Sequence, residues 1–460
     1  MTAPTYLSTR GRAPEIGFAE ALLRGMAPDG GLYLPSVWPN RSPAEIAWLQ
    51  SLPYPELAYE ILRLFIGDDL PNGALRAAAE RMAAFDDPAV TPCVELEPGL
   101  RVLELFHGPT AAFKDLAMQM MAPLTEAALE KRGESLLLLT ATSGDTGAAA
   151  VRAFAGSQRI RLAVLHPLDR VSPVQRRQMT TSGADNVLNL AVRGDFDDCQ
   201  RLVKALLADE GLREGQRLSS VNSINWGRLV GQIPYYLAAA KATGGPPRFV
   251  VPTGNFGDAF AGWAAQRIGL KAGRLTCAVN ANDALARALN EGRYARRPAT
   301  PTASVSMDVQ APSNFERLVF EASGRDAERT AALFETFARE GAVEIPPDLL
   351  AAMRENVEAV SIGEAETSAQ IAHAWKAWGR VVCPHTAVAL AAAGRVDRAE
   401  GPVVALSTAH PAKFPEAVSK ALGVEPEAPA QLRGLEGKTE RFEVVDADLN
   451  AVRAALSALA

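Results

Sequence analysis

The sequence is poor in cysteine and histidine, and neither residue type forms a metal or redox motif. The four cysteines, Cys93, Cys199, Cys277 and Cys383, lie far apart and include no CxxC pair. The five histidines show no HxxxH or HExxH spacing. These absences argue against a metal site and against a disulfide framework, so we expect the cysteines to be reduced and structural.

Three further absences narrow the class of protein. No uncharged apolar stretch is long enough to span a bilayer, and the N-terminus has no charged start followed by an apolar core and a cleavage site. No run of lysine or arginine stands out and the net charge is −6, which argues against nucleic acid as the main partner. We expect a cytoplasmic protein without a membrane partner; an organelle address with a weak signature is left open.

The composition that remains is typical of a globular protein, with 48% hydrophobic and 22% charged residues. A chain of 460 residues is long enough for two to four domains. From about residue 135, apolar runs alternate with amphipathic stretches of helical length, which predicts βαβ units and a largely parallel sheet. The expected strands lie within 135–142, 160–167, 186–194, 248–257, 274–282 and 402–411.

The pattern divides the chain into three parts. Residues 1–100 read as a largely helical, loop-rich cap, and residues 101–240 as a smaller α/β domain. Residues 241–460 read as a larger, discontinuous α/β domain with a helical insertion at about 312–379 that shows no obvious strand. Flexible joints are expected at 243–248, 296–304 and 425–437, where glycine and proline gather.

Two strand–loop–helix segments are candidate anion sites. In VPTGNFGD (251–258), glycines let the backbone approach a ligand, and the helix start offers free N–H groups that suit a phosphate. The loop has neither a lysine nor the GxGxxG spacing, so a P-loop and a dinucleotide fingerprint do not fit. In SGDT (143–146), backbone N–H groups and two hydroxyls suit a carboxylate. An ordinary capped turn, with Asp258 as N-cap in the first loop, remains the alternative for each.

Lys114 stands alone in HGPTAAFKDLAMQMM (107–121). Apart from Asp115, no other charged residue lies between Phe106 and Thr125. In the first turns of a helix, both the dipole and partial burial disfavour an ammonium group and lower the amine's pKa. A neutral amine is what a Schiff-base lysine needs. The alternative is a solvated helix residue.

Taken together, these segments resemble a known family. HGPTAAFKD, TSGDTGAA, VNSINWGRL, VPTGNFGD and TAHPAKF are similar to motifs of the threonine synthases, which are pyridoxal-phosphate enzymes of fold type II related to the tryptophan synthase β chain. The motifs run in family order from Tyr6 to Phe414. The resemblance implies two parallel-sheet α/β domains and an N-terminal, largely helical cap.

The resemblance also assigns cofactor-binding residues. It implies that Lys114 carries pyridoxal 5'-phosphate through a Schiff base. The hydroxyl of Thr408 would face the pyridine nitrogen, although a threonine after a strand is also a common turn residue. The cofactor's phosphate would be bound by five consecutive residues, Gly254, Asn255, Phe256, Gly257 and Asp258.

The remaining implied residues concern the substrate. Its α-carboxylate would be bound by Ser143, Gly144, Asp145 and Thr146. Most fold type II relatives have asparagine where Asp145 stands, so the role of this carboxylate is left open. For the substrate's phosphate the candidates are Ser223, Asn225 and Arg228, with Lys413 as a further one, because a phosphate needs cationic or donor groups.

The implied activity is conversion of O-phospho-L-homoserine and water into L-threonine and phosphate, by γ-elimination and then β-addition of water. This is a carbon–oxygen lyase reaction and the last step of threonine biosynthesis. One alternative keeps the fold and cofactor but dehydrates serine or threonine, and another is a non-catalytic binding protein of the same fold. The partner is a small molecule, and the chain is expected to be a monomer or homodimer.

Overall fold

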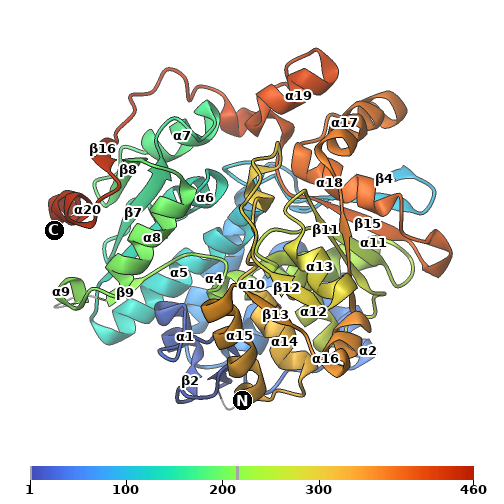
Figure 1. Cartoon of the computed structure of the whole chain (residues 1–460), viewed down its shortest axis with the longest axis horizontal. Helices are drawn as coiled ribbons and strands as arrows, with labels where there is room; N and C mark the ends of the chain where they lie inside the picture. Colours follow the sequence, from blue (N-terminus) through green and yellow to red (C-terminus); the bar gives the residue numbers. More distant parts are fainter. Residues whose placement is uncertain (1–2, 214–216, 460) are drawn as a thin grey trace.

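The computed structural model of the chain describes residues 3–213 and 217–459. Two bodies of sheet and helix lie side by side, the smaller at the left of Figure 1 and the larger at the right, with the N-terminal segment below them. The last part of the chain crosses back from the larger body to the smaller, so that the C-terminus lies beside β8.

Six strands form the larger sheet, in the order β14-β11-β10-β15-β5-β4. All neighbours pair in parallel except β4 and β5, which are antiparallel. The strands are β4 (Cys93–Glu97), β5 (Leu100–Glu104), β10 (Arg248–Pro252), β11 (Leu275–Val279), β14 (Val357–Ser361) and β15 (Val403–Ser407). The three central strands are buried at every residue, as expected for a parallel sheet covered on both faces.

The smaller sheet has the order β16-β8-β7-β6-β9 and is parallel throughout. Its strands are β6 (Leu136–Ala141), β7 (Ile160–Pro167), β8 (Val187–Arg193), β9 (Arg217–Ser219) and β16 (Glu443–Asp446). Successive side chains of β6 point to opposite faces: Leu136 and Leu138 join the main core, and Leu137 and Leu139 join a separate cluster with α8. Both faces of this sheet are therefore covered.

Helices surround both sheets. Those of the smaller body and the chain before it are α5 (Lys114–Arg132), α6 (Asp145–Phe154), α7 (Pro173–Thr180), α8 (Phe196–Leu207), α9 (Glu210–Arg213) and α20 (Leu449–Leu456). Those of the larger body are α10 (Trp226–Val230), α11 (Ile233–Ala242), α12 (Gly257–Arg267), α13 (Ala284–Glu291), α14 (Phe315–Ala322), α15 (Ala327–Glu340), α16 (Pro347–Arg354), α17 (Glu364–Trp378), α18 (Pro384–Ala393) and α19 (Pro415–Leu422). The predicted α/β class is confirmed.

The N-terminal part is less purely helical than the sequence pattern predicts. It contains α1 (Phe18–Arg24), α2 (Pro43–Ser51), α3 (Tyr54–Ile66) and α4 (Asn72–Glu80). It also contains a three-stranded antiparallel sheet of β1 (Thr5–Ser8), β2 (Ile16–Gly17) and β3 (Tyr33–Pro35). Strand β4, within the same hundred residues, belongs to the larger sheet.

The prediction that residues 312–379 lack a strand is wrong. β13 (Ala342–Glu344) pairs with β12 (Arg293–Ala295), and β14 forms an edge of the larger sheet. Only two residues of β14, Val357 and Ala359, are buried. A five-residue edge strand with polar neighbours has too short an apolar pattern to stand out between helices.

Sheet membership also departs from the predicted domain limits. β5 precedes the smaller body in sequence but pairs with β15 of the larger sheet, and β16 comes near the C-terminus but pairs with β8 of the smaller sheet. The chain therefore passes between the two bodies more often than the ranges 101–240 and 241–460 suggest.

Candidate active site

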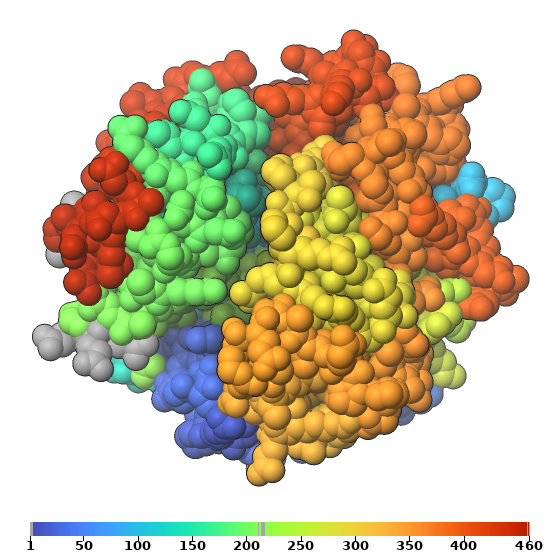
Figure 2. Space-filling view, in the orientation of Figure 1, coloured from blue at the N-terminus to red at the C-terminus, as the bar shows by residue number. Residues whose placement is uncertain are grey.

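One cavity of about 1270 Å³ collects the loops that follow β6 and β10, the start of α5 and the end of β15. Ligands of open parallel sheets bind at the carboxyl ends of the strands, which is where these loops lie. The volume exceeds the 300–1,000 Å³ that is usual for one small ligand. Figure 2 shows the mouth as a hollow between α8 and the segment that carries residues 296–313.

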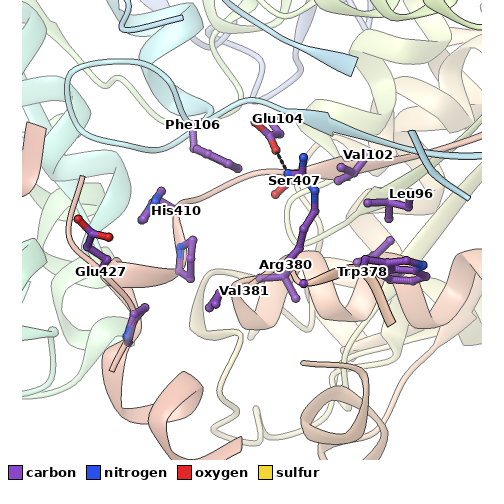
Figure 3. A pocket seen from close by; sticks show the side chains of 15 residues that line it. Leu96, Val102, Glu104, Phe106, Trp378, Arg380, Val381, Ser407, His410 and Glu427 are labelled. Carbon is purple, nitrogen blue, oxygen red and sulfur yellow. Dashed lines mark hydrogen bonds and ion pairs between the residues drawn. The ribbon is translucent and has the colours of Figure 1, made fainter. Parts of the chain in front are cut away.

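A second cavity, of about 520 Å³, is lined by Trp378, Arg380, Glu104 and other residues (Figure 3). Arg380 donates to Glu104 at 2.5 Å, and the other carboxylate oxygen of Glu104 lies 2.9 Å from Nε2 of His107. This cavity adjoins the beginning of the HGPT segment, but neither Lys114 nor either glycine loop lines it. The larger cavity is therefore the candidate active site.

Lys114 is the first residue of α5 and lines the larger cavity. Its neighbours are fixed to the end of β15, because the N–H of Phe113 donates to the carbonyl of Thr408 at 2.8 Å. Burial lowers the pKa of Lys114; Asp145 opposes this effect, and the charge of Arg228 reinforces it. The structure thus gives Lys114 the partly buried position and the lowered pKa that its place in the sequence predicts.

Asp145 lies between two lysines. Its Oδ2 is 3.4 Å from Nζ of Lys114, and its Oδ1 accepts from Nζ of Lys413 and from Nε2 of Gln175, both at 2.8 Å. Burial alone would raise the pKa of Asp145, but Lys413 and Lys114 hold it well below its ordinary value. Lys413 is fully buried, does not line the cavity and also donates to the carbonyl of Thr110 at 2.7 Å. Its amine is therefore paired with protein groups and is not available to bind the substrate's phosphate.

The loop between β6 and α6 has a fixed backbone and two hydroxyls on the cavity. Gly144 has φ = 138°, and a Cβ there would lie 2.4 Å from the side chain of Gln175, so only glycine fits. The hydroxyl of Thr142 accepts two backbone N–H groups at 2.9 Å and caps the loop. Ser143 and Thr146 line the cavity and are left to contact a ligand.

The loop between β10 and α12 offers backbone donors. In the part of the chain that the structure describes, the N–H groups of Gly254, Asn255 and Phe256 have no protein acceptor. Phe256 adopts the left-handed region with φ = 62°, whereas neither glycine has a positive φ. Gly254 is required by packing, because a Cβ there would lie 2.6 Å from the carbonyl oxygen of Ser306.

Asp258 is not the N-cap of α12. Its Oδ1 accepts from the hydroxyls of Tyr235 at 2.5 Å and Tyr236 at 2.7 Å. Burial raises the pKa of Asp258 to about 6, although both tyrosines lower it. The side chain therefore anchors the first turn of α12 to α11, and only the backbone of Asp258 is placed to serve an anion.

Thr408 follows β15 and lines the cavity. It is held by its neighbours as well as by Phe113: Ala409 forms a β-bridge with Ala112, and the hydroxyl of Ser407 lies 2.9 Å from that of Thr386. Thr408 thus lines the same cavity as Lys114.

Of the three residues proposed to bind the substrate's phosphate, two line the cavity and one does not. Arg228 is buried, lines the cavity and donates to the carbonyl of Val221 at 3.1 Å, while its Nε has no partner among the described residues. Burial lowers the pKa of Arg228 to about 10. Ser223 also lines the cavity. Asn225 does not: its side chain caps α10 by accepting from the N–H of Gly227 at 3.0 Å and donates to the carbonyl of Leu22 at 2.8 Å.

Comparison with known proteins explains this set of residues. The family model described as "Threonine synthase N terminus" matches residues 5–82, "Pyridoxal-phosphate dependent enzyme" matches residues 86–345, and "Threonine synthase, C-terminal" matches residues 386–456. The threonine synthase of Pseudomonas aeruginosa is 43% identical over 458 residues, which cover 98% of each chain. The chain belongs to the threonine synthase family.

Solved structures of the threonine synthase family agree with the fold. The crystal structure of pyridoxal-phosphate-bound threonine synthase from Brucella melitensis has a TM-score of 0.95 and 43% identity, covering 99% of each chain. The yeast threonine synthase structure has a TM-score of 0.92 and 33% identity, covering 98% of each chain. The chain is therefore a pyridoxal-phosphate-dependent enzyme of fold type II.

The residues on this cavity fit pyridoxal phosphate. An amine with a lowered pKa, that of Lys114, is available for a Schiff base. Three unpartnered N–H groups at the start of α12 form an anion site for the cofactor's phosphate. Thr408 supplies a hydroxyl on the cavity for a ring nitrogen. Of the site residues that the sequence predicts, all line this cavity except Gly144, Asn225 and the further candidate Lys413.

Some residues of the site carry no signal in the sequence. Gln175, which fixes Asp145 and fills the space beside Gly144, comes from α7 and belongs to no motif. His385 lines the cavity and accepts from the N–H of Ser306 at 3.2 Å; burial lowers its pKa to about 4. The cap by Thr142 could have been expected, because a hydroxyl two residues before a glycine at a strand end is a common turn cap.

Two kinds of feature are absent from the described residues. No helix in the described ranges is long and apolar enough to cross a membrane. No group of three or more histidine, cysteine, aspartate or glutamate side chains in those ranges is arranged to hold a metal ion.

Proposed function

We propose that the chain converts O-phospho-L-homoserine and water into L-threonine and phosphate, the last step of threonine biosynthesis. The observation that supports this substrate most strongly is Arg228. Its guanidinium is buried on the same cavity as Lys114, and no carboxylate among the described residues pairs with it. A buried cation without a partner is costly, and an anionic ligand would satisfy it.

Pyridoxal phosphate, bound through Lys114, supplies an electron-withdrawing ring that stabilises negative charge on the substrate's carbon atoms. The N–H groups of residues 254–256 would hold its phosphate, and Thr408 would offer a hydroxyl to its ring nitrogen. A hydroxyl, unlike a carboxylate, does not force that nitrogen to be protonated.

Lys114 is the base that the reaction needs. Removal of phosphate from Cγ and addition of water at Cβ require removal of a proton from Cα and from Cβ, delivery of a proton to Cγ, which becomes the methyl group of threonine, and return of a proton to Cα. Once the substrate amine has taken its place on the cofactor, the freed amine of Lys114 is the group available to make them. Its lowered pKa favours the neutral form, which accepts a proton.

The substrate's two charged ends would be bound at separate places. Ser143 and Thr146, with the backbone of their loop, would hold the α-carboxylate that all amino acids share. Arg228 and Ser223 would hold the phosphate that distinguishes O-phosphohomoserine. Binding the two ends separately would fix the carbon chain between them next to Lys114.

A panel of substrates tests this function. The purified holoenzyme is given O-phospho-L-homoserine, L-homoserine, L-serine or L-threonine, and threonine, phosphate and 2-oxo acids are measured. The proposal predicts threonine and phosphate in equal amounts from O-phosphohomoserine alone. A 2-oxo acid from serine or threonine as the main product would instead identify a dehydratase, and no product from any of them would identify a binding protein.

The proposal extends to the setting of the enzyme. We place it in the cytoplasm, acting on a small molecule as a monomer or homodimer, without nucleic acid or membrane as a partner. Light scattering of the purified holoenzyme gives the mass that decides between monomer and homodimer.

A further inference from the structure

Two lysines, one partly and one fully buried, share one carboxylate at the edge of the active site. Lys413 is fully buried and its Nζ lies 2.8 Å from Oδ1 of Asp145. Lys114 lies 3.4 Å from Oδ2 of the same carboxylate. The shorter contact is with the lysine that does not line the cavity.

Hydrogen bonds hold both the amine and the backbone of Lys413 in place. Besides Asp145, its amine donates to the carbonyl of Thr110 at 2.7 Å. Thr110 is itself held, because its N–H and its hydroxyl both donate to Asp115 at 2.8 Å. The backbone carbonyl of Lys413 accepts from the hydroxyl of Ser172 at 3.2 Å. Because all of these contacts are with other protein groups, Lys413 is held in place without a ligand.

The charges around Lys114 come from five elements. Asp145 is the first residue of α6, Asp258 lies in α12, Arg228 in α10, His385 in α18, and Lys413 in the short turn before α19. Without Lys413, the full charge of Asp145 would face Lys114 in a site of low dielectric, where an ion pair is strong. Such a pair would hold Lys114 as an ammonium ion, which cannot act as a nucleophile or a base.

We propose that Lys413 is a positioning residue: it pairs with Asp145 and so prevents that carboxylate from becoming the dedicated counterion of Lys114. Asp145 then orients the amine of Lys114 without holding its proton. This inference rests on the proposed function only in taking Lys114 as the lysine that carries the cofactor. The directions of the neighbouring effects agree, because Asp145 raises the pKa of Lys114 and Lys413 lowers it.

The test is a pH titration of the holoenzyme's near-visible absorbance, which reports protonation of the nitrogen that joins Lys114 to the cofactor. It is measured for the wild type, Lys413→Met, Lys413→Arg and the double variant Asp145→Asn/Lys413→Met. We expect the midpoint of Lys413→Met to rise by about one pH unit, the low end for a change in a neighbouring charge. Lys413→Arg keeps the cation and should keep the wild-type midpoint.

The titration midpoint of the double variant should shift in the opposite direction to that of Lys413→Met. It removes both charges, and since the effect of Asp145 on Lys114 is the larger of the two, the midpoint should fall below that of the wild type. A purely structural role for Lys413 predicts lower thermal stability with unchanged midpoints, and this result would overturn the inference.

The double variant also decides the matter if Lys413→Met fails to fold, because it removes Asp145 together with Lys413 and so leaves neither of these two charges buried without the other. A wild-type midpoint in the double variant contradicts the inference. All of these titrations need bound cofactor but no turnover, so they remain informative even if O-phosphohomoserine is not the substrate.

Discussion

Arg228 is a buried cation whose charge no carboxylate of the described residues balances. It is buried on the cavity, and the described residues supply one carbonyl acceptor and no carboxylate for it. Lys114 and Lys413, by contrast, share a carboxylate that is part of the protein. Arg228 is thus a buried cation on this cavity that we propose pairs with an anion of the substrate.

Replacing Arg228 by alanine should weaken recognition of the substrate's phosphate. A hydrogen bond to a charged group contributes about 1.5–3 kcal/mol, so kcat/KM for O-phosphohomoserine should fall about ten- to a hundredfold or more. Cofactor binding should be unchanged. The measurement is a titration of the holoenzyme's absorbance with O-phosphohomoserine and with L-homoserine, which lacks the phosphate.

Thr146→Val is the matched control for Arg228→Ala. It should weaken binding of both ligands alike, since it touches the carboxylate that they share. Equal losses for both ligands in Arg228→Ala would make Arg228 a carboxylate-binding or structural residue.

The two glycines of the GNFG loop should differ in their tolerance of a side chain. A Cβ at Gly254 would lie 2.6 Å from a backbone oxygen that cannot move easily, whereas a Cβ at Gly257 would lie 3.3 Å from the amide of Asn314. Overpacking of this kind costs about 1–3 kcal/mol. We therefore expect Gly254→Ala to weaken affinity for pyridoxal phosphate about tenfold and Gly257→Ala to have a smaller effect, measured by equilibrium dialysis. Equal affinities would contradict this placement of the loop.

At the scale of elements, the active site depends on segments that connect strands to one another. The HGPT segment leaves β5 at Glu104, and its first residue, His107, bridges two carboxylates: Nδ1 lies 2.8 Å from Asp86 and Nε2 lies 2.9 Å from Glu104. Arg380, which reaches Glu104 from the end of α17, closes this network beside the second cavity (Figure 3). The segment that leads to α5 is thereby tied to Asp86, to the end of β5 and to the residue that follows α17 and its cap.

This network makes stability depend on pH. Burial alone would lower the pKa of His107, but the hydrogen bonds to Glu104 and Asp86 outweigh it, and the pKa is raised above its ordinary value. A raised histidine pKa stabilises the fold below the unfolded-state value of about 6.5, and this contribution is lost as pH rises through the folded-state value. His107→Gln should therefore lower the thermal unfolding temperature most at pH 5.5 and least at pH 9. A difference that grows with pH would contradict this account.

The elements around the site are also where prediction from sequence succeeded. The strand–loop–helix units of β6–α6 and β10–α12 carry long apolar runs followed by glycine, and both lie where the pattern places them. The failures are of a different kind. β14 is a short edge strand, and the side chain of Asn225 accepts from the N–H of Gly227 in its own helix but also donates to Leu22, in a helix about two hundred residues away in the sequence. Neither a short edge strand nor a long-range side-chain bond leaves a periodic signal.

At the scale of the whole molecule, the N-terminal part completes the larger body. Arg10 forms a bidentate contact with Glu316 of α14 at 3.0 and 2.9 Å, and the hydroxyl of Thr9 donates to the same carboxylate at 2.7 Å. Arg10 and Glu316 both line the active-site cavity. The first residues of the chain are therefore part of the wall of the site.

Breaking the ion pair between Arg10 and Glu316 should weaken the attachment of the N-terminal part to the larger body. Glu316→Ala leaves Arg10 and Thr9 without their partner, which should cost about 3 kcal/mol, the low end for a buried ion pair because a fifth of the Arg10 side chain is exposed. Glu335→Ala is the matched control, since its pair with Arg12 is exposed and is worth less than about 1 kcal/mol. Thermal unfolding of the two variants should show a large decrease for Glu316→Ala only, together with a raised KM. Equal decreases would contradict a special role for the Arg10 contact.

The measurement that tests the account most directly identifies the lysine that carries the cofactor. The holoenzyme is reduced with borohydride, which fixes the cofactor to its lysine, and is then digested and mapped by mass spectrometry. Two lysines, Lys114 and Lys413, both contact Asp145, but of these two only Lys114 lines the cavity. The account predicts that the label is on Lys114 and that Lys114→Ala folds, carries no label and forms no threonine. A label on Lys413, or on any other lysine, would contradict it.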